Sequence, residues 1–467
     1  MTANIHYDCI IVGGGVTGTA LLYQLARFTN LKRLRLVEKY DCPAQVNSHT
    51  RNNSQTLHWG DIETHYSREK AQAMRRDAAM LVNYASHLPP RERDRILFRM
   101  PRMVLGVGAE ESRLVRERYA AIRACYPRLS LFSPQEIADL EPNVALVDGA
   151  WRREEILAMG TPDDWSAVDF EALANSFSAQ CVRIDRNSDR HVSQLFGTEV
   201  RTIRKDAAGY VLETSRGLML ARSVVVCAGG HSLSIAQRMG LGLEYACLPV
   251  AGSFYLAPEA LHGKVYTVQN PRLPFPAIHG DRDIRAHGKT RFGPTALMLP
   301  MLDRRPRDSL RDYRETLRFD RTVAAALWHL LRAADTRNYL VRNLLYEVPW
   351  LNRHLFVRAI RKIVPDLTAG DIDYAEGHGG IRPQLIDRQT RRLQLADVRI
   401  IDGKGIVFNI TPSPGGTSCL GNATRDLRLV ADHLGARVDW DALERELLSG
   451  TTASGLAEEI PMLAEAG

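Results

Sequence analysis

The clearest hydrophobic pattern lies at the start of the chain, where a short apolar run gives way to glycines. Residues 7–12 (YDCIIV) are rich in β-branched side chains and end at three consecutive glycines, which is typical of a buried parallel strand. Apolar positions then recur at helical spacing over residues 16–28, and residues 34–38 (LRLVE) predict a second strand that ends in an acid. The pattern therefore predicts a βαβ unit in the first forty residues.

The rest of the chain alternates between helical and strand-like stretches. Residues 67–119 are mostly helical and charged, residues 303–365 form a long basic helical stretch, and a last helix is expected near 422–434. The other predicted strands cover residues 103–107, 200–203, 210–214, 223–227, 254–256 and 264–268. Because 467 residues exceed what one core usually supports, we expect two packed domains.

Composition and charge place the chain among ordinary globular proteins. Lys and Arg number 61 against 54 Asp and Glu, which gives a net charge of +7. This excess suits an anionic substrate or an anionic membrane surface, and a merely solvated surface is the alternative. The seven cysteines never form a C-x-x-C pair, so we expect reduced thiols in a cytoplasmic protein and no metal site.

Membrane-related segments are also informative. No apolar stretch approaches the ~18 residues of a spanning helix. The first apolar run belongs to a strand and does not follow the pattern of a secretory signal. We therefore expect a soluble or peripheral protein.

The glycine-rich turn at residues 13–18 (GGGVTG) indicates nucleotide binding. It matches G-x-G-x-x-G directly after the predicted strand and at the start of the predicted helix. Gly13 permits the tight turn, Gly15 lets the backbone approach a pyrophosphate, and Gly18 lets helix and strand pack closely. Glu38 lies 20 residues beyond Gly18 at a strand end, where a carboxylate accepts hydrogen bonds from ribose hydroxyls. A purely structural glycine turn is the alternative.

The same fingerprint serves FAD and NAD, so other features must choose between them. It occurs once in this chain, whereas an enzyme that also takes electrons from NAD(P)H through a second Rossmann domain should carry two. The cofactor site also draws on the far end of the chain, which suits a long ligand. We therefore favour FAD.

Five segments in a fixed order resemble the D-amino-acid-oxidase-like flavoproteins. They are NSQTLHWG at 53–60, PFPAIHG at 274–280, GPTA at 293–296, GIRPQ at 380–384 and PSPGGTS at 412–418. Within this group the chain is similar to the branch of L-2-hydroxyglutarate dehydrogenases and malate:quinone oxidoreductases. The segments SQT at 54–56, IET at 62–64, LPVAGSFY at 248–255 and VYTVQNP at 265–271 favour the short bacterial malate:quinone oxidoreductases.

This resemblance implies an α/β fold in which a Rossmann-like FAD-binding domain carries an inserted α+β substrate domain with a mixed sheet. We expect the FAD-binding domain to comprise residues 1–85, 145–245 and 376–440. The substrate and membrane-docking domain then comprises residues 86–144 and 246–375, and residues 441–467 form a C-terminal tail.

The resemblance also assigns FAD to the glycine-rich turns near both ends of the chain and to the loops beside them. The cofactor-binding residues expected on this basis are Gly13, Gly15, Val16, Thr17, Gly18, Glu38, Lys39, Asn53, Ser54, Gln55, Thr56, Val200, Ala228, Gly229, Pro414, Gly415, Gly416, Thr417 and Ser418.

Three residues are candidates for catalysis. Arg382 matches the family's carboxylate-binding arginine, and a guanidinium fork suits an acid substrate because it pairs bidentately and keeps its charge. His279 matches the family's histidine beside the flavin and is the leading general base, since oxidation of a hydroxyl requires a proton acceptor that works near neutral pH. His58 follows the Asn53-Ser54 turn and is the second candidate base. Ion-paired or structural roles are the alternatives.

Two further residues are candidates for substrate binding. Tyr255 lies on a predicted strand and could donate a hydrogen bond to a substrate carboxylate, whereas a strand tyrosine is often part of a core. Arg291 could pair with the second carboxylate of a dicarboxylic acid, although a solvated strand end explains it as well.

The basic stretch at 303–365 raises the question of membrane docking. Aromatic and aliphatic residues at helical spacing are interleaved with arginines there, as in helices that lie at a membrane interface. Such helices usually pack on their own protein. Because a quinone resides in the bilayer, we expect peripheral attachment to the inner face of the cell membrane, with no role for nucleic acid.

Three functions follow from these features. The first is oxidation of L-malate, or a related 2-hydroxy dicarboxylate, by hydride transfer to FAD with a membrane quinone as acceptor. The second is an L-2-hydroxyglutarate dehydrogenase or oxidase. The third is a flavin-binding partner protein without activity, which leaves Arg382 and His279 unexplained.

Overall fold

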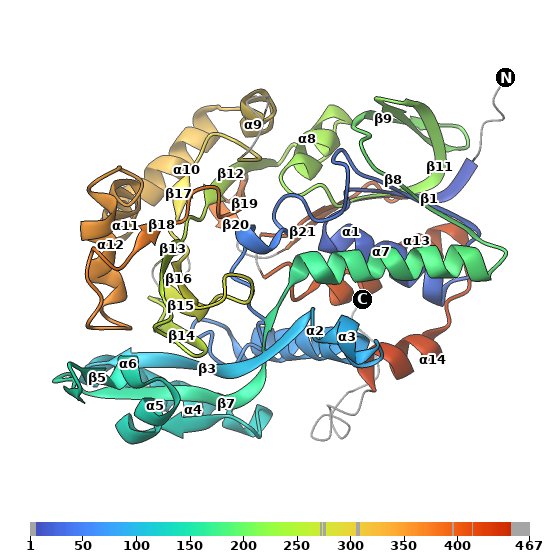
Figure 1. Cartoon of the computed structure of the whole chain (residues 1–467). Helices are drawn as coiled ribbons and strands as arrows, with labels where there is room; N and C mark the ends of the chain where they lie inside the picture. Colours follow the sequence, from blue (N-terminus) through green and yellow to red (C-terminus); the bar gives the residue numbers. More distant parts are fainter. Residues whose placement is uncertain are drawn as a thin grey trace.

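The computed structural model describes residues 6–270, 273, 277–304, 309–394, 397–412 and 414–449. Several parts of the predicted motifs lie outside the described residues, namely Pro271, residues 274–276, Ser413 and residues 450–467. The described chain forms two eight-stranded sheets, a four-stranded sheet and a two-stranded hairpin (Figure 1). The predicted α/β class is confirmed.

The first sheet grows from the predicted βαβ unit, which is confirmed as β1 (His6–Val12), α1 (Val16–Phe28) and β2 (Arg33–Val37). Its other strands are β8 (His191–Leu195), β9 (Val200–Asp206), β10 (Gly209–Thr214), β11 (Gly217–Val226), β21 (Val398–Ile401) and β22 (Ile406–Ile410). The order is β21-β22-β11-β1-β2-β8, and β9 and β10 extend it beside β11. Strands β22, β11, β1, β2 and β8 run parallel, so their carboxyl ends meet at one edge.

Helices cover both faces of this sheet. Most lie on one face with α1, namely α2 (Arg68–Ser86), α7 (Phe170–Asn187), α13 (Cys419–Leu434) and α14 (Trp440–Leu443), while α8 (His231–Arg238) packs on the other. Cys9 and Ile11 point into the first core, and Ile10 and Val12 into the second. Since successive side chains of a strand alternate between faces, coverage on both faces explains why this strand is apolar throughout.

The second sheet is mixed, as expected for the substrate domain. Its strands are β3 (Leu97–Val107), β4 (Ser130–Phe132), β7 (Ile156–Val168), β13 (Tyr255–Pro258), β14 (Lys264–Thr267), β15 (His279–Arg282), β16 (Lys289–Gly293) and β18 (Asp373–Tyr374). The order is β18-β13-β16-β15-β14-β3-β7-β4. Strands β14 and β3 pair in parallel, and the other neighbours pair antiparallel.

Strand β7 departs from the expected domain boundary. It pairs with β3 over nearly its whole length, although the expected division placed residues 145–245 in the nucleotide-binding domain. The proline-rich break at residues 141–143 precedes the hairpin of β5 (Leu146–Val147) and β6 (Ala150–Trp151), so the chain returns to the second sheet after it. Short helices α3 (Pro90–Arg93), α4 (Ala109–Ile122), α5 (Pro134–Leu140) and α6 (Pro142–Ala145) accompany this region.

A small third sheet supplies the strand that carries Arg382. Its strands are β12 (Tyr245–Ala251), β17 (Leu297–Met298), β19 (Ile381–Asp387) and β20 (Arg392–Gln394), in the order β17-β12-β19-β20. Strands β12 and β19 pair antiparallel, with Val250 opposite Arg382. Residues 381–394 therefore belong to this sheet and not to the nucleotide-binding sheet.

The basic stretch is helical, as predicted, and forms α9 (Ser309–Leu317), α10 (Arg321–Arg332), α11 (Ala334–Leu345) and α12 (Asn352–Ile360) at one end of the molecule (Figure 1). Val323, Leu327 and Leu330 pack against the small sheet, so part of the predicted apolar face is internal. No helix in the described ranges is long and apolar enough to cross a bilayer.

Candidate functional site

A cavity of about 930 Å³ opens at the carboxyl ends of the parallel strands. Val12, Val37, Cys227 and Thr411, which end or follow β1, β2, β11 and β22, all line it. Ligands of doubly wound sheets bind at this edge, and the volume lies in the upper part of the ~300–1,000 Å³ range of small-molecule sites. The cavity is therefore the candidate cofactor and substrate site.

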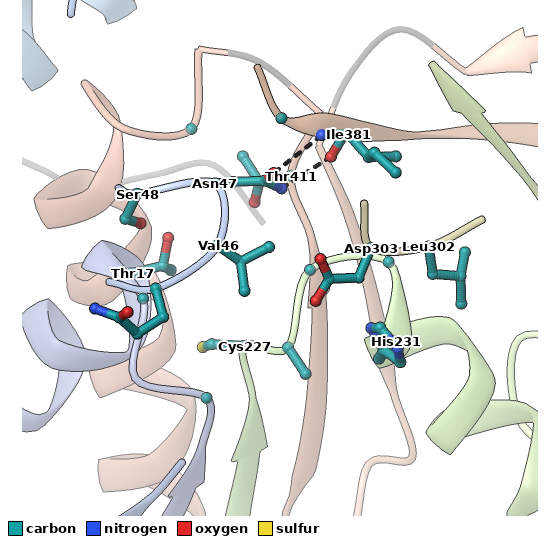
Figure 2. Close-up of a pocket in the computed structure, with 18 of the residues that line it drawn as sticks. Thr17, Val46, Asn47, Ser48, Cys227, His231, Leu302, Asp303, Ile381 and Thr411 are labelled. Atoms are coloured by element: carbon teal, nitrogen blue, oxygen red, sulfur yellow. Dashed lines mark hydrogen bonds between the residues drawn. The ribbon is translucent and has the colours of Figure 1, made fainter. Parts of the chain in front are cut away.

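Loops from distant parts of the chain are fastened together around this cavity. Asn47 donates from Nδ2 to the carbonyl of Ile381 (2.8 Å) and accepts at Oδ1 from the Ile381 backbone N–H (3.1 Å), as Figure 2 shows. The hydroxyl of Tyr40, which also lines the cavity, donates to Asp303 (2.6 Å). These contacts join the loop after β2 to β19, next to Arg382, and to the segment before α9.

The glycines of the first turn have different structural roles. A Cβ atom on Gly13 would lie 2.4 Å from the carbonyl oxygen of Cys227, and one on Gly18 would lie 2.0 Å from the carbonyl oxygen of Gly13. These two glycines are required for packing. A Cβ atom on Gly15 would meet only Ser48 Oγ, at 3.3 Å, and Gly15 lines the cavity. Gly15 therefore keeps open the space where a pyrophosphate would lie at the start of α1.

Glu38 occupies the position expected of a ribose-binding acid. It follows β2 and lines the cavity. Its carboxylate accepts hydrogen bonds from the backbone N–H groups of Gly14 (2.5 Å) and Tyr40 (2.9 Å), which hold it at the rim. Lys39 also lines the cavity and lies 3.5 Å from Asp303.

Most of the expected cofactor residues line this cavity, and three do not. Those that line it are Gly13, Gly15, Val16, Thr17, Glu38, Lys39, Asn53, Ser54, Thr56, Val200, Ala228, Gly229, Pro414, Gly415, Gly416 and Thr417. Gly18 lies behind the turn, and Ser418 is buried at the start of α13. Gln55 has a positive φ of 53° and turns away to bond Ile284 N–H and Asp283. Sequence spacing alone does not reveal this reversal.

Two buried basic side chains, those of Lys264 and Arg291, donate hydrogen bonds to backbone carbonyls of the 50–54 loop. Lys264 donates to the carbonyl of Ser54 (3.1 Å) and pairs with Asp281 (3.2 Å). Arg291 donates to the carbonyl of Asn53 (2.8 Å) and pairs with Asp283 (3.0 Å). Arg291 is fully buried and is not among the residues that line the cavity, so it is not a solvated strand end. Its contacts hold the loop in place.

Arg382 presents an unpaired guanidinium to the cavity. It lines the cavity from β19, and none of the ion pairs or side-chain hydrogen bonds found among the described residues involves it. Burial lowers the pKa of Arg382, while the nearby phenols of Tyr339, Tyr266 and Tyr66 act in the opposite direction. A guanidinium fork at the cavity wall that lacks an anionic partner among the described residues is poised to receive one from a ligand.

The two candidate histidines occupy different positions. His58 lines the cavity, and its Nδ1 lies 2.5 Å from Glu63 Oε1. His279 does not line the cavity. It is 4% exposed, stacks on the ring of Tyr266 with the centroids 4.2 Å apart, and has Nε2 3.2 Å from Asp281. Because a base must reach the substrate, this geometry favours His58 over His279, which the sequence ranked first.

Tyr255 belongs to the core of the second domain. Its hydroxyl donates to the carbonyl of Tyr346 (2.5 Å), its ring stacks on Phe356 at 4.0 Å, and the side chain is fully buried. The expected role as a substrate donor is therefore wrong, and the alternative of a core residue applies.

Asn409 is a cavity residue that sequence analysis missed. It lines the cavity, its Nδ2 donates to Asp426 (2.5 Å), and its buried Oδ1 has no hydrogen-bond partner among the residues that the structure describes. A polar residue within the apolar strand β22 (IVFNI) was the available signal. The Oδ1 atom of Asn409 and the carboxylate of Glu38 can accept hydrogen bonds from ligand hydroxyls, and the glycine-rich turn at 13–18 leaves room for phosphates. These residues therefore fit a ligand such as FAD. No group of three or more His, Cys, Asp or Glu in the described ranges is placed to hold a metal.

Comparison with known proteins identifies the same architecture. The family model of FAD-dependent oxidoreductases matches residues 8–421. The L-α-glycerophosphate oxidase of Mycoplasma pneumoniae, solved with FAD bound, superposes with a TM-score of 0.61 at 18% identity, over 91% of this chain and 95% of that one. At this identity the likeness shows the fold alone.

Closer relatives narrow the family. The chain is 42% identical to a probable malate:quinone oxidoreductase of Campylobacter jejuni, over 95% of this chain and 99% of the relative. It is 40% identical to the malate:quinone oxidoreductase of Helicobacter pylori, over 95% and 98%. The chain is therefore an FAD-dependent oxidoreductase that belongs to the malate:quinone oxidoreductases.

Proposed function

We propose that this protein oxidises L-malate to oxaloacetate, with FAD as hydride acceptor and a membrane quinone as the final electron acceptor. The observation that carries the proposal is the unpaired guanidinium of Arg382 in the same cavity as His58 and the glycine-rich turn. A cavity that combines a nucleotide cradle, a free cation and a histidine suits oxidation of a small hydroxy acid. The family relationship names malate among such acids.

The residues of this cavity divide the work between binding and proton transfer. Arg382 binds a carboxylate of the substrate with its fork, which fixes the neighbouring C2 centre. His58 takes the proton of the C2 hydroxyl as general base. Residues at the strand ends, including Gly15, Glu38 and Asn409, hold the cofactor. Bound FAD supplies the acceptor for the two electrons that leave C2 as hydride.

Peripheral attachment to the inner, cytoplasmic face of the membrane is part of the proposal, since a quinone must be reached there. Eight of the fourteen large hydrophobic side chains exposed in the described ranges lie between residues 310 and 350. They are Leu310, Phe319, Trp328, Leu331, Val341, Leu344, Leu345 and Trp350. Exposed apolar residues interleaved with arginines support docking of α9–α12 on an anionic lipid surface.

The test is anaerobic reduction of the purified flavoprotein. We expect L-malate to bleach the oxidised flavin absorbance within seconds, and 2-hydroxyglutarate at equal concentration to do so at least ~10-fold more slowly, because an extra methylene misplaces the second carboxylate. Faster bleaching by 2-hydroxyglutarate would instead favour the L-2-hydroxyglutarate dehydrogenase alternative. A protein that holds FAD and is bleached by neither acid would support a flavin-binding role without catalysis.

A further inference from the structure

Glu63 lies behind His58 and contacts the ring of this cavity residue. Its Oε1 lies 2.5 Å from Nδ1 of His58, and its side chain is 5% exposed. The other carboxylate oxygen, Oε2, is buried and has no hydrogen-bond partner in the described part of the chain. A buried carboxylate without a partner costs free energy because it loses its hydration. The contact with one ring nitrogen of His58 therefore indicates a specific role for Glu63.

Glu63 is ionised at neutral pH. Burial raises the pKa of Glu63, whereas the hydrogen bond and charge of His58 lower it. The lowering effects outweigh burial, so the pKa of Glu63 lies below its ordinary value. None of the hydrogen bonds or ion pairs found among the described residues joins His65 to this carboxylate. The pair therefore consists of a carboxylate and an imidazole that donates from Nδ1.

Other charged and titratable groups also face this pair. Arg118 donates to the backbone carbonyls of Tyr66 (2.8 Å) and Glu63 (3.4 Å), not to the carboxylate. The ring of Tyr266 meets the His58 ring edge-on at 6.5 Å. The titratable groups around Glu63 and His58 are Asp61, His65, Tyr66, Lys70, Arg118, Tyr126 and Tyr266.

The backbone around His58 is anchored independently of Glu63. The backbone N–H of His58 donates to Thr417 Oγ1 (3.1 Å), and Thr417 in turn donates to the carbonyl of Thr56 (3.4 Å). Only the ring orientation and the tautomer are left for a side chain to fix.

We propose that Glu63 is a positioning residue that holds His58 with the proton on Nδ1 and leaves Nε2 as the bare nitrogen that accepts the substrate proton. The inference rests on the proposed function and adds a residue to it. In the reaction the hydroxyl O–H bond breaks toward Nε2, the C2–H bond breaks with its electron pair toward the flavin, and the C2 carbonyl is left. The negative charge of Glu63 then stabilises the imidazolium that forms, as an orienting carboxylate does in other histidine-based sites.

Substitution Glu63→Gln tests this role, because it keeps the shape of the side chain and removes its charge. We expect the limiting rate of anaerobic flavin reduction by malate to fall about 100-fold or more. The ionisation that limits reduction should move to lower pH, because the imidazolium loses its anionic partner. FAD content and the malate concentration that half-saturates reduction should stay within about twofold, since Arg382 is intact. Glu69→Gln, an exposed glutamate on α2, is the matched control and should behave as the parent.

A second variant and a spectroscopic measurement keep the test decisive if Glu63→Gln folds poorly. Glu63→Asp retains the carboxylate and should reduce at least ~10-fold faster than Glu63→Gln. Histidine ¹⁵N NMR of the parent protein, with His58→Gln to assign the signal, should show the tautomer protonated at Nδ1. A parental rate and pH profile in Glu63→Gln, or an Nε2-protonated His58, would overturn the proposal. If malate fails to reduce the parent protein, the proposed function fails instead, and the NMR result still decides the tautomer.

Discussion

Arg382 lines the cavity and pairs with no carboxylate among the described residues, so its substitution is informative. Arg382→Met keeps most of the side-chain length but leaves the substrate carboxylate without a charged partner. A buried charge-assisted pair is worth a few kcal/mol, so kcat/KM for malate should fall by about 10²- to 10³-fold. Arg382→Lys should recover only part of this loss, because an ammonium group cannot pair bidentately.

Steady-state kinetics with a soluble electron acceptor provide the measurement for Arg382. Since Arg382 stands on β19 at the edge of the cavity, both variants should retain FAD and the parental melting temperature. Malate kinetics unchanged in the Met variant would remove Arg382 from the substrate site.

Individual residues show where sequence reasoning succeeds and where it stops. The roles of Gly13, Gly15 and Glu38 follow from local spacing along a βαβ unit, so the sequence predicted their positions. The choice between His58 and His279 depends on which ring reaches the cavity, and the stacking on Tyr266 that withdraws His279 is a tertiary contact. Tyr255 was misassigned for the same reason, because its partner Tyr346 lies 91 residues away.

At the scale of helices, the contact between α2 and α13 contains a buried acid. Burial raises the pKa of Asp77 to about 7, although Arg425 and Arg76 act to lower it. Between pH 3.8 and about 7, Asp77 therefore keeps its proton in the folded protein but loses it in the unfolded chain. Stability is therefore greatest at low pH for this group and is lost as pH rises from about 4 to 7.

Asp77→Asn should remove the loss of folding stability that accompanies ionisation of Asp77. At pH 8 the variant should be more stable than the parent by an amount on the order of 1–3 kcal/mol, and the difference should shrink steadily as pH falls from 7 to 4. Thermal or denaturant unfolding across this pH range measures it. The exposed Asp139→Asn substitution on α5 is the control. A gain of stability that is the same at pH 4 and pH 8 would contradict the explanation.

Helices and strands with a clear hydrophobic periodicity could be predicted from the sequence, but the strands with which they pair could not. The helical spacing at residues 16–28 and the basic helical stretch both appear in the structure, where α1 has the predicted bounds. The expected domain division did not anticipate that β7 pairs with β3, because this pairing joins segments about sixty residues apart and no local pattern encodes it. The same holds for β19, whose partner β12 lies more than 130 residues earlier.

At the scale of the whole molecule, the segment from Leu310 to Trp350 carries eight of the fourteen large hydrophobic side chains exposed in the described ranges, and its helices α10 and α11 lie at one end of the protein (Figure 1). Trp328→Ser combined with Trp350→Ser removes the two largest of them, which are 70% and 76% exposed. We expect binding to anionic phospholipid vesicles to weaken by ~10-fold or more, while flavin reduction by malate stays at the parental rate. Vesicle co-sedimentation measures the first and stopped-flow absorbance the second.

A tryptophan elsewhere on the surface provides the matched control for membrane docking. Trp440→Ser changes an exposed residue on α14, which packs in the core that contains α1 and α2, and should leave vesicle binding unchanged. Equal loss of binding in both proteins would point to a general effect of exposed tryptophan and not to docking by these helices.

The assembly of the cofactor cavity has a consequence for synthesis. Its walls come from residues between Val12 and Thr417, and the sheet beneath it needs β22 next to β11. A ribosome that adds ~5–20 residues per second must work for roughly 20–80 seconds before the last of these residues exists. The first βαβ unit is complete long before that, but the cavity residues contributed by β22 and the loop after it are still missing. We therefore expect FAD to bind only after residue 417 has left the ribosome, and a chain truncated before this residue to lose the cofactor on purification.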